Sequence, residues 1–333
     1  MWKRWLEVIK TCNLPENMDM SDADGVSKWL VITRACVFSM TITAGLIGGL
    51  LALSQGPINW WFWLVGIVGL ILAHASNNMI NDYFDYQYGS DLSEDYPRGL
   101  YSPHPIHSGW LTSSQLMAGI LAVNVLDLLI MIYLTVQTGW PVLVFAITGF
   151  LISVFYVAEP VKLKYRGLGE LGVFLIWGPL MIGGIYYIVS LSMPAWVIAA
   201  SIPYALMVTT VLMGKHIDKF EPDEKNEIQT LPVLLGKEQS LFLNKILFIA
   251  FHLIVIILVL TNTLGVWILL SLLSIPQLVR ETWPKFSQPK PESKPEGYPV
   301  WPLWYVSWAF RYTRTAGGYF IFGLIMNALI PLG

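Results

Sequence analysis

Carboxylates and amides follow one another at helical spacing in the stretch from Asn77 to Asp91. Its polar side chains begin one turn earlier and recur at intervals of four, four and three residues: His74, Asn78, Asp82 and Asp85. On a helix this spacing places them on one face. Magnesium prefers oxygen ligands and commonly binds one or two carboxylates together with substrate phosphates. Asp82 and Asp85 therefore predict a magnesium site that could hold a diphosphate, with Asp91 as a further candidate ligand.

A second acidic group lies in the run 215–225, and it could face the first across one cavity. Asp218 and Asp223 are five residues apart, which would point them about 140° apart on an unbroken helix. Pro222 disfavours helical geometry at Glu221. The sequence therefore predicts that Asp218 ends a helix, that Asp223 folds back from a loop, and that both bind the metal.

Amide and ammonium groups accompany both acidic groups and are candidates for the diphosphate. Lysine binds phosphate oxygens as a point charge, although each lysine here also fits one held at a membrane surface. The diphosphate candidates are Asn78, Asn81, Lys162, Lys164, Lys215, Lys219 and Lys225.

The composition identifies a membrane protein. Of 333 residues, 55% are hydrophobic and 13% charged, and the mean hydropathy is +0.58, too apolar for a soluble domain of this length. The net charge of −2 gives no reason to expect a nucleic-acid partner. Cys12 precedes the first predicted span and Cys36 lies within it, so both thiols are expected to be free.

The elements that must position these groups are apolar segments long enough to cross about 30 Å of hydrocarbon. Together they predict an all-α, multi-pass bundle of about nine transmembrane helices. The expected spans are 29–53, 59–82, 115–136, 141–158, 169–191, 195–214, 240–261, 265–281 and 303–331.

Lysine and arginine gather in the second, fourth, sixth and eighth connections between these spans, whereas the other connections carry no charge. Positively charged loops face the cytoplasm. Both acidic groups are therefore expected on the cytoplasmic side of the cell membrane. Residues 1–28 are expected to form a cytoplasmic amphipathic segment, either an interfacial helix or a frayed tail, before the transmembrane domain 29–333.

Other polar and aromatic side chains within the spans also suggest roles. Charged groups inside a membrane are costly, which marks Arg34 and Asp127 as functional candidates, although Arg34 could extend to the surface. An aromatic repeat in the last span predicts a belt at the membrane interface. It comprises Trp301, Trp304, Tyr305, Trp308 and Tyr312.

These motifs resemble those of the UbiA superfamily of intramembrane prenyltransferases, over essentially the whole chain. The run Asn81-Asp82-x-x-Asp85 resembles the family's first aspartate-rich motif, and Asp218 with Asp223 resembles its second. Three segments are similar to the branch that prenylates 1,4-dihydroxy-2-naphthoate on the way to menaquinone: 165–170, 177–180 and 230–236. This chain departs from the family in its spacing between Asp218 and Asp223 and in having Gly89 where a third aspartate is common.

The resemblance implies a helical bundle around a central cavity that a prenyl chain enters from the lipid. Magnesium held by Asp82, Asp85, Asp218 and Asp223 would stabilise the departing diphosphate, and an aromatic acceptor would attack the allylic cation. Arg166, and with it Tyr165, would bind the acceptor, whose carboxylate needs a cationic neighbour. The expected ligands are thus a prenyl diphosphate, an aromatic acceptor and Mg²⁺, within a lipid bilayer.

Other acceptors and other classes of membrane protein are also compatible with parts of this pattern. Other acceptors within the superfamily are a chlorophyllide, haem, hydroxybenzoate or a glycerol phosphate lipid. A transporter would account for Asp127 but for neither acidic group. A lipid phosphotransferase would need a glycine-rich aspartate motif that the sequence lacks.

Overall fold

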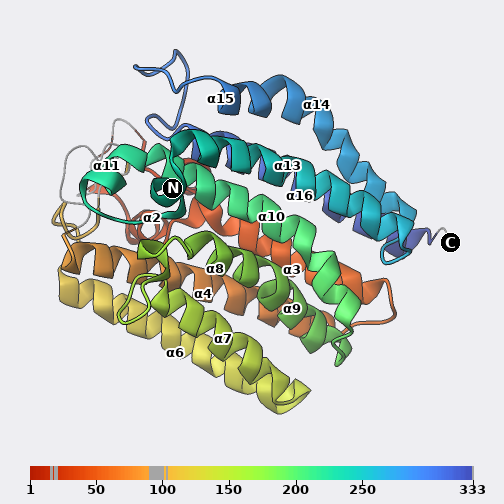
Figure 1. The fold of residues 1–333 in the computed structure, drawn as a ribbon. Coiled ribbons are helices and arrows are strands. Elements are labelled where there is room, and N and C mark those ends of the chain that lie inside the picture. Colours follow the sequence, from red (N-terminus) through yellow and green to blue (C-terminus); the bar gives the residue numbers. More distant parts are fainter. Residues whose placement is uncertain (16–17, 19–21, 90–100, 103, 332–333) are drawn as a thin grey trace.

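The computed structural model describes residues 1–333 except 16–17, 19–21, 90–100, 103 and 332–333. The described chain is almost entirely helical, and its one β contact is an isolated backbone bridge between Arg166 and Gln229. The long helices run side by side, with α10 (Ala195–Asp218) passing through the middle of the bundle (Figure 1). The predicted all-α membrane fold is confirmed.

The amino-terminal part of the chain is broken where a single span over 29–53 is predicted. Arg34 has a φ of 55°, a left-handed conformation that ends one helix and redirects the chain into the next. Three elements result: α2 (Gly25–Ile32), η2 (Ala35–Val37) and α3 (Phe38–Leu53). A separate helix, α1 (Trp2–Thr11), precedes them.

The next elements follow the predicted spans closely. They are α4 (Trp60–Gln87), α6 (Ser113–Thr138), α7 (Pro141–Phe155), the short turn η3 (Leu163–Tyr165), α8 (Gly169–Leu175), the π-helical turn η4 (Ile176–Leu180) and α9 (Met181–Ser190).

After α10 the chain forms α11 (Phe220–Lys225), α12 (Leu231–Leu235), α13 (Lys237–Leu260), η5 (Val266–Ser274), α14 (Ile275–Gln277), η6 (Leu278–Thr282), α15 (Trp283–Ser287) and α16 (Tyr305–Leu329). Among the described residues, six helices are long and apolar enough to cross a membrane. They are Ala35–Leu53, Trp60–Gln87, Ser113–Thr138, Gly169–Ser190, Ala195–Asp218 and Lys237–Leu260. The count of nine therefore stays a prediction.

The core forms where α10 meets its neighbours. Gly214 of α10 allows the backbone of α16 to approach, because a Cβ at this position would lie 2.9 Å from the carbonyl carbon of Tyr305. This packing buries Trp304, Tyr305 and Tyr312. The prediction of an interfacial aromatic belt was wrong for these three side chains, because α16 packs inside the bundle. Tyr312 packs against Phe248, Tyr305 against Phe286 and Trp304 against Tyr298.

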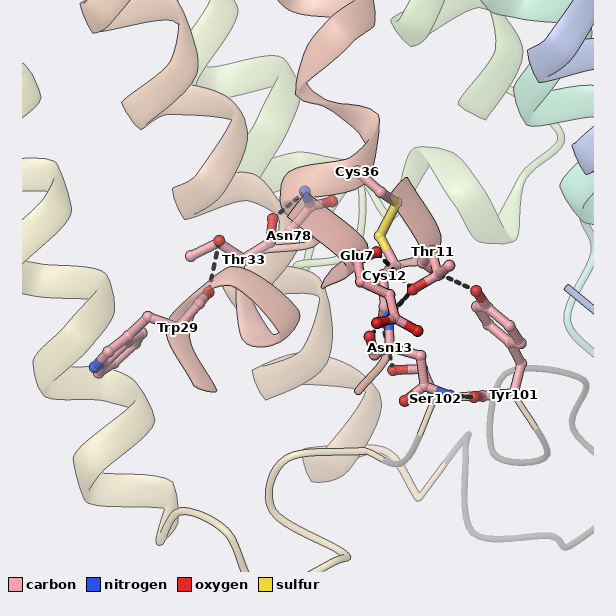
Figure 2. The surroundings of a disulfide bond; sticks show 10 residues. All are labelled: Glu7, Thr11, Cys12, Asn13, Trp29, Thr33, Cys36, Asn78, Tyr101 and Ser102. Atoms are coloured by element: carbon pink, nitrogen blue, oxygen red, sulfur yellow. Dashed lines mark hydrogen bonds between the residues drawn. A yellow bond between two sulfur atoms is a disulfide. The ribbon is translucent and has the colours of Figure 1, made fainter. Parts of the chain in front are cut away.

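The expectation of two free thiols was also wrong. Cys12 and Cys36 form a disulfide, with their Cα atoms 5.2 Å apart (Figure 2). Cys12 ends α1 in a left-handed conformation with a φ of 59°, and α1 then folds back onto α2 and η2. The amino-terminal segment is thus joined covalently to the start of the transmembrane part, a contact that separation along the sequence did not reveal.

Candidate active site

The ends of α4 and α10 and the short helix α11, which carry the acidic groups, lie at one end of the bundle, beside the amino terminus (Figure 1). The hydroxyl of Tyr156, which follows α7, is within electrostatic reach of both Asp85 and Asp223. Lys215 lies one turn before Asp218 on α10 and is partly buried. The two acidic groups that the sequence pairs are therefore brought to one site.

The predicted polar stripe exists because α4 continues unbroken to Gln87, beyond the apolar part of its sequence. All four of its side chains are buried: His74, Asn78, Asp82 and Asp85. Burying a charge in this way is costly unless a partner compensates it. Each carboxylate of the stripe does have a cationic partner, supplied by a different segment.

Asp82 is paired with Arg34, and its side chain is fully buried. The left-handed turn at Arg34 places its guanidinium against α4, while the Asn78 amide donates a hydrogen bond to the carbonyl oxygen of Thr33 at 2.9 Å. His104 also lies against this point, with Nε2 3.0 Å from the backbone oxygen of Asp82. Arg34 thus serves as a counter-ion inside the site, not as a side chain extended to the membrane surface.

Asp85 is paired with Lys164, whose Nζ lies 2.9 Å from Oδ1, and both side chains are 3% exposed. The Asn81 amide donates a hydrogen bond to the other oxygen of Asp85. Lys164 reaches this position because its connection folds back tightly, with its backbone N–H bonded to the carbonyl oxygen of Tyr156 at 2.9 Å. Asn81 and Lys164, two of the predicted diphosphate ligands, therefore contact the first acidic group directly.

Lys162 lies beside this pair but is directed outward. Its Nζ is 2.6 Å from Glu159 and 4.0 Å from the centre of the Tyr88 ring. The hydrogen bond to Glu159 raises the pKa of Lys162. The Tyr165 ring meets that of Tyr88 edge to face at 6.2 Å, so this part of the connection forms an aromatic and cationic rim.

Asp218 begins the second group, and its carboxylate is occupied by backbone donors. Its oxygens accept hydrogen bonds from the N–H groups of Trp304, Tyr305 and Val306 at 3.0, 3.1 and 2.9 Å. The first N–H groups of a helix have no partner within the helix, and a carboxylate there also complements the helix dipole. With Lys290 3.8 Å away, Asp218 has the surroundings of a cap for α16.

Asp223 has the opposite environment. It lies in α11, a short helix in which Pro222 occupies the first turn, so it is not on the loop that the sequence predicts. Asp223 is fully buried, and neither carboxylate oxygen has a hydrogen-bond partner among the described residues. Lys219 is its cationic neighbour, with Nζ 3.8 Å from Oδ1.

Several predicted site residues lie farther out or beyond the described part of the chain. Arg166 and Lys225 are exposed. The Arg166 guanidinium donates a hydrogen bond to the carbonyl oxygen of Pro160 at 2.9 Å, which places it on the outer side of the connection. Asp91 lies outside the described residues.

A second buried polar group lies beside the acidic site, and the sequence interpretation missed it. His216 Nδ1 is 2.7 Å from Glu170 Oε1, and its Nε2 is 3.3 Å from the Tyr156 hydroxyl. Tyr156 and Glu170 lie on either side of the connection after α7, and His216 comes from α10, 46 residues after Glu170. The only signal in the sequence is the presence of each ionisable side chain at a predicted membrane surface.

An apolar cavity of about 460 Å³ extends from this end into the bundle, between α4, α6, α7 and α9. His74 and Asn77 line its end nearest the acidic group, whereas Asp127 lines it deeper in the membrane part. Gly69 of α4 lies opposite, since a Cβ there would be 3.3 Å from Asp127 Oδ1. Its walls are otherwise mostly aliphatic and aromatic, which suits a hydrocarbon chain.

The carboxylates differ in how well they suit a metal ion. No group of three or more His, Cys, Asp or Glu side chains lies together in the part of the chain that the structure describes. Asp223 fits a cation because its buried oxygens lack other donors. Asp82 and Asp85 are compatible because their present partners are side chains, whereas the three backbone donors leave Asp218 the least suited.

Comparison with known proteins identifies the family. The model of the UbiA prenyltransferase family matches residues 40–308. The chain is 22% identical over 249 residues to a 1,4-dihydroxy-2-naphthoate octaprenyltransferase of Bacillus subtilis, covering 75% of this chain and 79% of that protein. It is 26% identical to the protein of the same description from Haemophilus influenzae, covering 62% and 69%.

Among solved structures, a UbiA homologue from Archaeoglobus fulgidus bound to GPP and Mg²⁺ has a TM-score of 0.62 at 15% identity. The alignment covers 90% of this chain and 99% of that one. The likeness shows the fold. Because the family model matches most of its length, the chain belongs to the UbiA prenyltransferase family, and it is a multi-pass membrane enzyme of the prenyltransferase class.

Proposed function

We propose that this UbiA-family prenyltransferase transfers a polyprenyl group from its diphosphate to 1,4-dihydroxy-2-naphthoate. The observation that carries this proposal is the junction of the apolar cavity with the buried ion pairs of α4. His74 and Asn77 line the cavity, and Asp82 and Asp85 follow on the same helix. A prenyl diphosphate has the matching form, a hydrocarbon chain ending in a dense negative charge.

The cationic side chains of the site account for diphosphate binding. Lys164, Arg34 and Lys219 each lie beside a buried carboxylate. A diphosphate entering this site would exchange those partners for its own oxygens, with Lys215 within reach. Water is largely excluded here, which strengthens each charge interaction.

Asp82, Asp85 and Asp223 are the side chains that would hold Mg²⁺ in this proposal, and Asp218 instead secures α16. The bound ion would act as a Lewis acid on the leaving diphosphate. Lys164 and Arg34 would hold the diphosphate oxygens and orient the allylic carbon toward the cavity. Relatives in the family with bound Mg²⁺ support the choice of metal.

The prenyl chain would enter the cavity from the bilayer between α6 and α7. Leu128 of α6 and Ile147 and Phe150 of α7 line the cavity, and each of these residues is about half exposed. In a membrane that surface faces lipid tails. A long chain could therefore slide in sideways without crossing the polar rim.

The acceptor assignment rests on three segments of the sequence and on relatives that carry this acceptor in their names. An electron-rich bicyclic diol traps a cation without a strong base, so positioning supplies most of the catalysis. Arg166 at the rim is our candidate for its carboxylate. The acidic groups would face the cytoplasm of the cell membrane, following the distribution of lysine and arginine.

The test offers purified protein one long prenyl diphosphate, Mg²⁺ and separate acceptors: 1,4-dihydroxy-2-naphthoate, 4-hydroxybenzoate and a glycerol phosphate lipid. Mass spectrometry should show a demethylmenaquinone, with release of carbon dioxide, only with the first. A product from another acceptor would overturn the acceptor assignment and leave the family unchanged.

A further inference from the structure

The buried polar group beside the acidic site consists of Tyr156, Glu170 and His216. Its hydrogen bonds run in one direction, from donor to acceptor. An ionised Glu170 can only accept, so its contact with His216 Nδ1 places the ring proton on that nitrogen. In the neutral imidazole Nε2 is then an acceptor, and it faces the Tyr156 hydroxyl at 3.3 Å. Tyr156 must donate its proton to His216, which leaves its oxygen lone pairs available to another donor.

Tyr156 lies next to the cavity, where a hydroxyl group of a bound substrate could donate a hydrogen bond to it. On α7 the cavity is lined by Gly149 and Ser153, and Tyr156 is the next residue on that face at a spacing of three. Its ring packs against the apolar cluster that contains Ile80, another cavity-lining residue. Tyr156 is only partly buried, and it is the next side chain beyond the lined part of the cavity toward the acidic groups.

The other charged groups near this hydroxyl are Lys164, Glu170, Asp85 and Asp223. Lys164 is paired with Asp85 and Glu170 Oε1 with His216, whereas Glu170 Oε2 and both oxygens of Asp223 have no hydrogen-bond partner among the described residues. In our assignment the oxygens of Asp223 hold the metal. Gly169 packs over both rings, 3.1 Å from Tyr156 Cε2 and 3.5 Å from His216 Cε1 measured to an added Cβ. Gly169 therefore helps to hold Tyr156 and His216 in place.

We propose that Tyr156 binds a hydroxyl group of the acceptor as a hydrogen-bond acceptor, and that Glu170 and His216 fix this polarity. The inference rests on the proposed function, because it assigns a subsite to the same reaction. It makes Tyr156 a specificity-determining residue that distinguishes a free hydroxyl from an ether. Glu170 and His216 are positioning residues that act through Tyr156.

The experiment measures equilibrium binding, so it does not depend on turnover. The purified protein, loaded with a non-reactive prenyl thiolodiphosphate and Mg²⁺, is titrated with 1,4-dihydroxy-2-naphthoate and with its 1-methoxy and 4-methoxy ethers. We expect the wild type to bind the diol at least 10-fold more tightly than one of the ethers. Tyr156→Phe should reduce that ratio to near 1 by weakening diol binding, with little change for the ether.

Glu170→Gln tests the polarity itself. A glutamine amide can donate to His216 Nδ1, which moves the ring proton to Nε2 and makes Tyr156 a donor to the cavity. The preference for the diol should then fall several-fold, although Tyr156 is still present. A merely structural role for Glu170 would lower thermal stability without changing the binding ratio.

Tyr312→Phe is the matched control. Tyr312 forms a similar pair with His252, 2.6 Å apart between α13 and α16, but it is fully buried there, whereas Tyr156 is partly exposed. This variant should keep the wild-type ratio. Equal ratios in the wild type and Tyr156→Phe would overturn the inference alone, whereas no binding of the diol to the wild type would overturn the proposed function together with it.

Discussion

Lys164 and Asp85 form a buried ion pair, 2.9 Å from Nζ to Oδ1, between the connection that follows α7 and the end of α4. The pair joins the predicted diphosphate ligand of one segment to the predicted metal ligand of another. It also closes the acidic site from the side of that connection. The pair therefore has a structural effect that can be measured apart from catalysis.

Lys164→Met should lower the free energy of unfolding by about 3 to 5 kcal/mol, because Asp85 is left buried without its counter-ion. Adding Asp85→Leu should restore most of this loss, since the charge is then removed as well. Thermal unfolding in detergent measures both effects. Lys237→Met is the control, because its partner Glu221 is largely exposed and such pairs contribute less than about 1 kcal/mol. A Lys164→Met protein as stable as the wild type would show that the pair is not buried.

Asp218 and Asp223 should respond differently to substitution. Asp218→Ala leaves backbone donors of α16 unsatisfied, at a cost of about 1 to 3 kcal/mol for each buried group, so it should lower the unfolding temperature. Asp223→Asn removes a charge that has no hydrogen-bond partner among the described residues, so it should mainly weaken Mn²⁺ binding. Electron paramagnetic resonance with Mn²⁺ separates the two effects. Loss of Mn²⁺ binding in a stable Asp218→Asn protein would return Asp218 to the metal site.

The Cys12–Cys36 disulfide should hold α1 against the first membrane helix. A cross-link between residues separated by 24 positions stabilises by about 3 kcal/mol in the chain-entropy description. Reduction should therefore increase amide hydrogen exchange in α1 by roughly 100-fold at that energy and leave α10 unchanged. A Cys12→Ser/Cys36→Ser protein should exchange rapidly with or without reductant. Slow exchange in that protein would mean that the contacts of Val8 and Val31 suffice.

Arg166→Ala should raise the KM for the acceptor and leave kcat nearly unchanged. The exposed guanidinium donates a hydrogen bond to the Pro160 carbonyl oxygen, on the outer side of the connection, so its removal should not disturb the ion pairs of α4. A charge-assisted hydrogen bond contributes about 1.5 to 3 kcal/mol, which corresponds to a KM increase of roughly 10- to 100-fold. Steady-state kinetics at saturating prenyl diphosphate provide the measurement. Arg311→Ala, which removes an exposed partner of Glu281, is the control. An equal fall in kcat would indicate a role in the reaction itself.

The orientation in the membrane can be tested with single cysteines in a protein lacking Cys12 and Cys36. A cysteine at Glu227, beside the second acidic group, should be labelled from the cytoplasmic side by an impermeant maleimide. One at Gly139, between α6 and α7, should be labelled only from the opposite side. Labelling of both positions from the same side would refute the arrangement of these spans.

The sequence alone determined the membrane class and most helix positions, because both follow from local composition and periodicity. The stripe from His74 to Asp85 is an example: once the segment is helical, spacings of four, four and three place these side chains on one face. The aspartate-rich motifs likewise indicated the family, which the family model confirms. These features involve residues within a few turns of one another.

Only the tertiary structure decided which partner each charge has. Asp218 caps a helix that begins 87 residues later at Tyr305, and Arg34 reaches Asp82 through a left-handed turn that no helical period reveals. The disulfide and the contacts of His216 arise in the same way. A buried charge takes the nearest compensating group in space. Which group is nearest depends on how the helices pack, and periodicity along one segment carries no information about that.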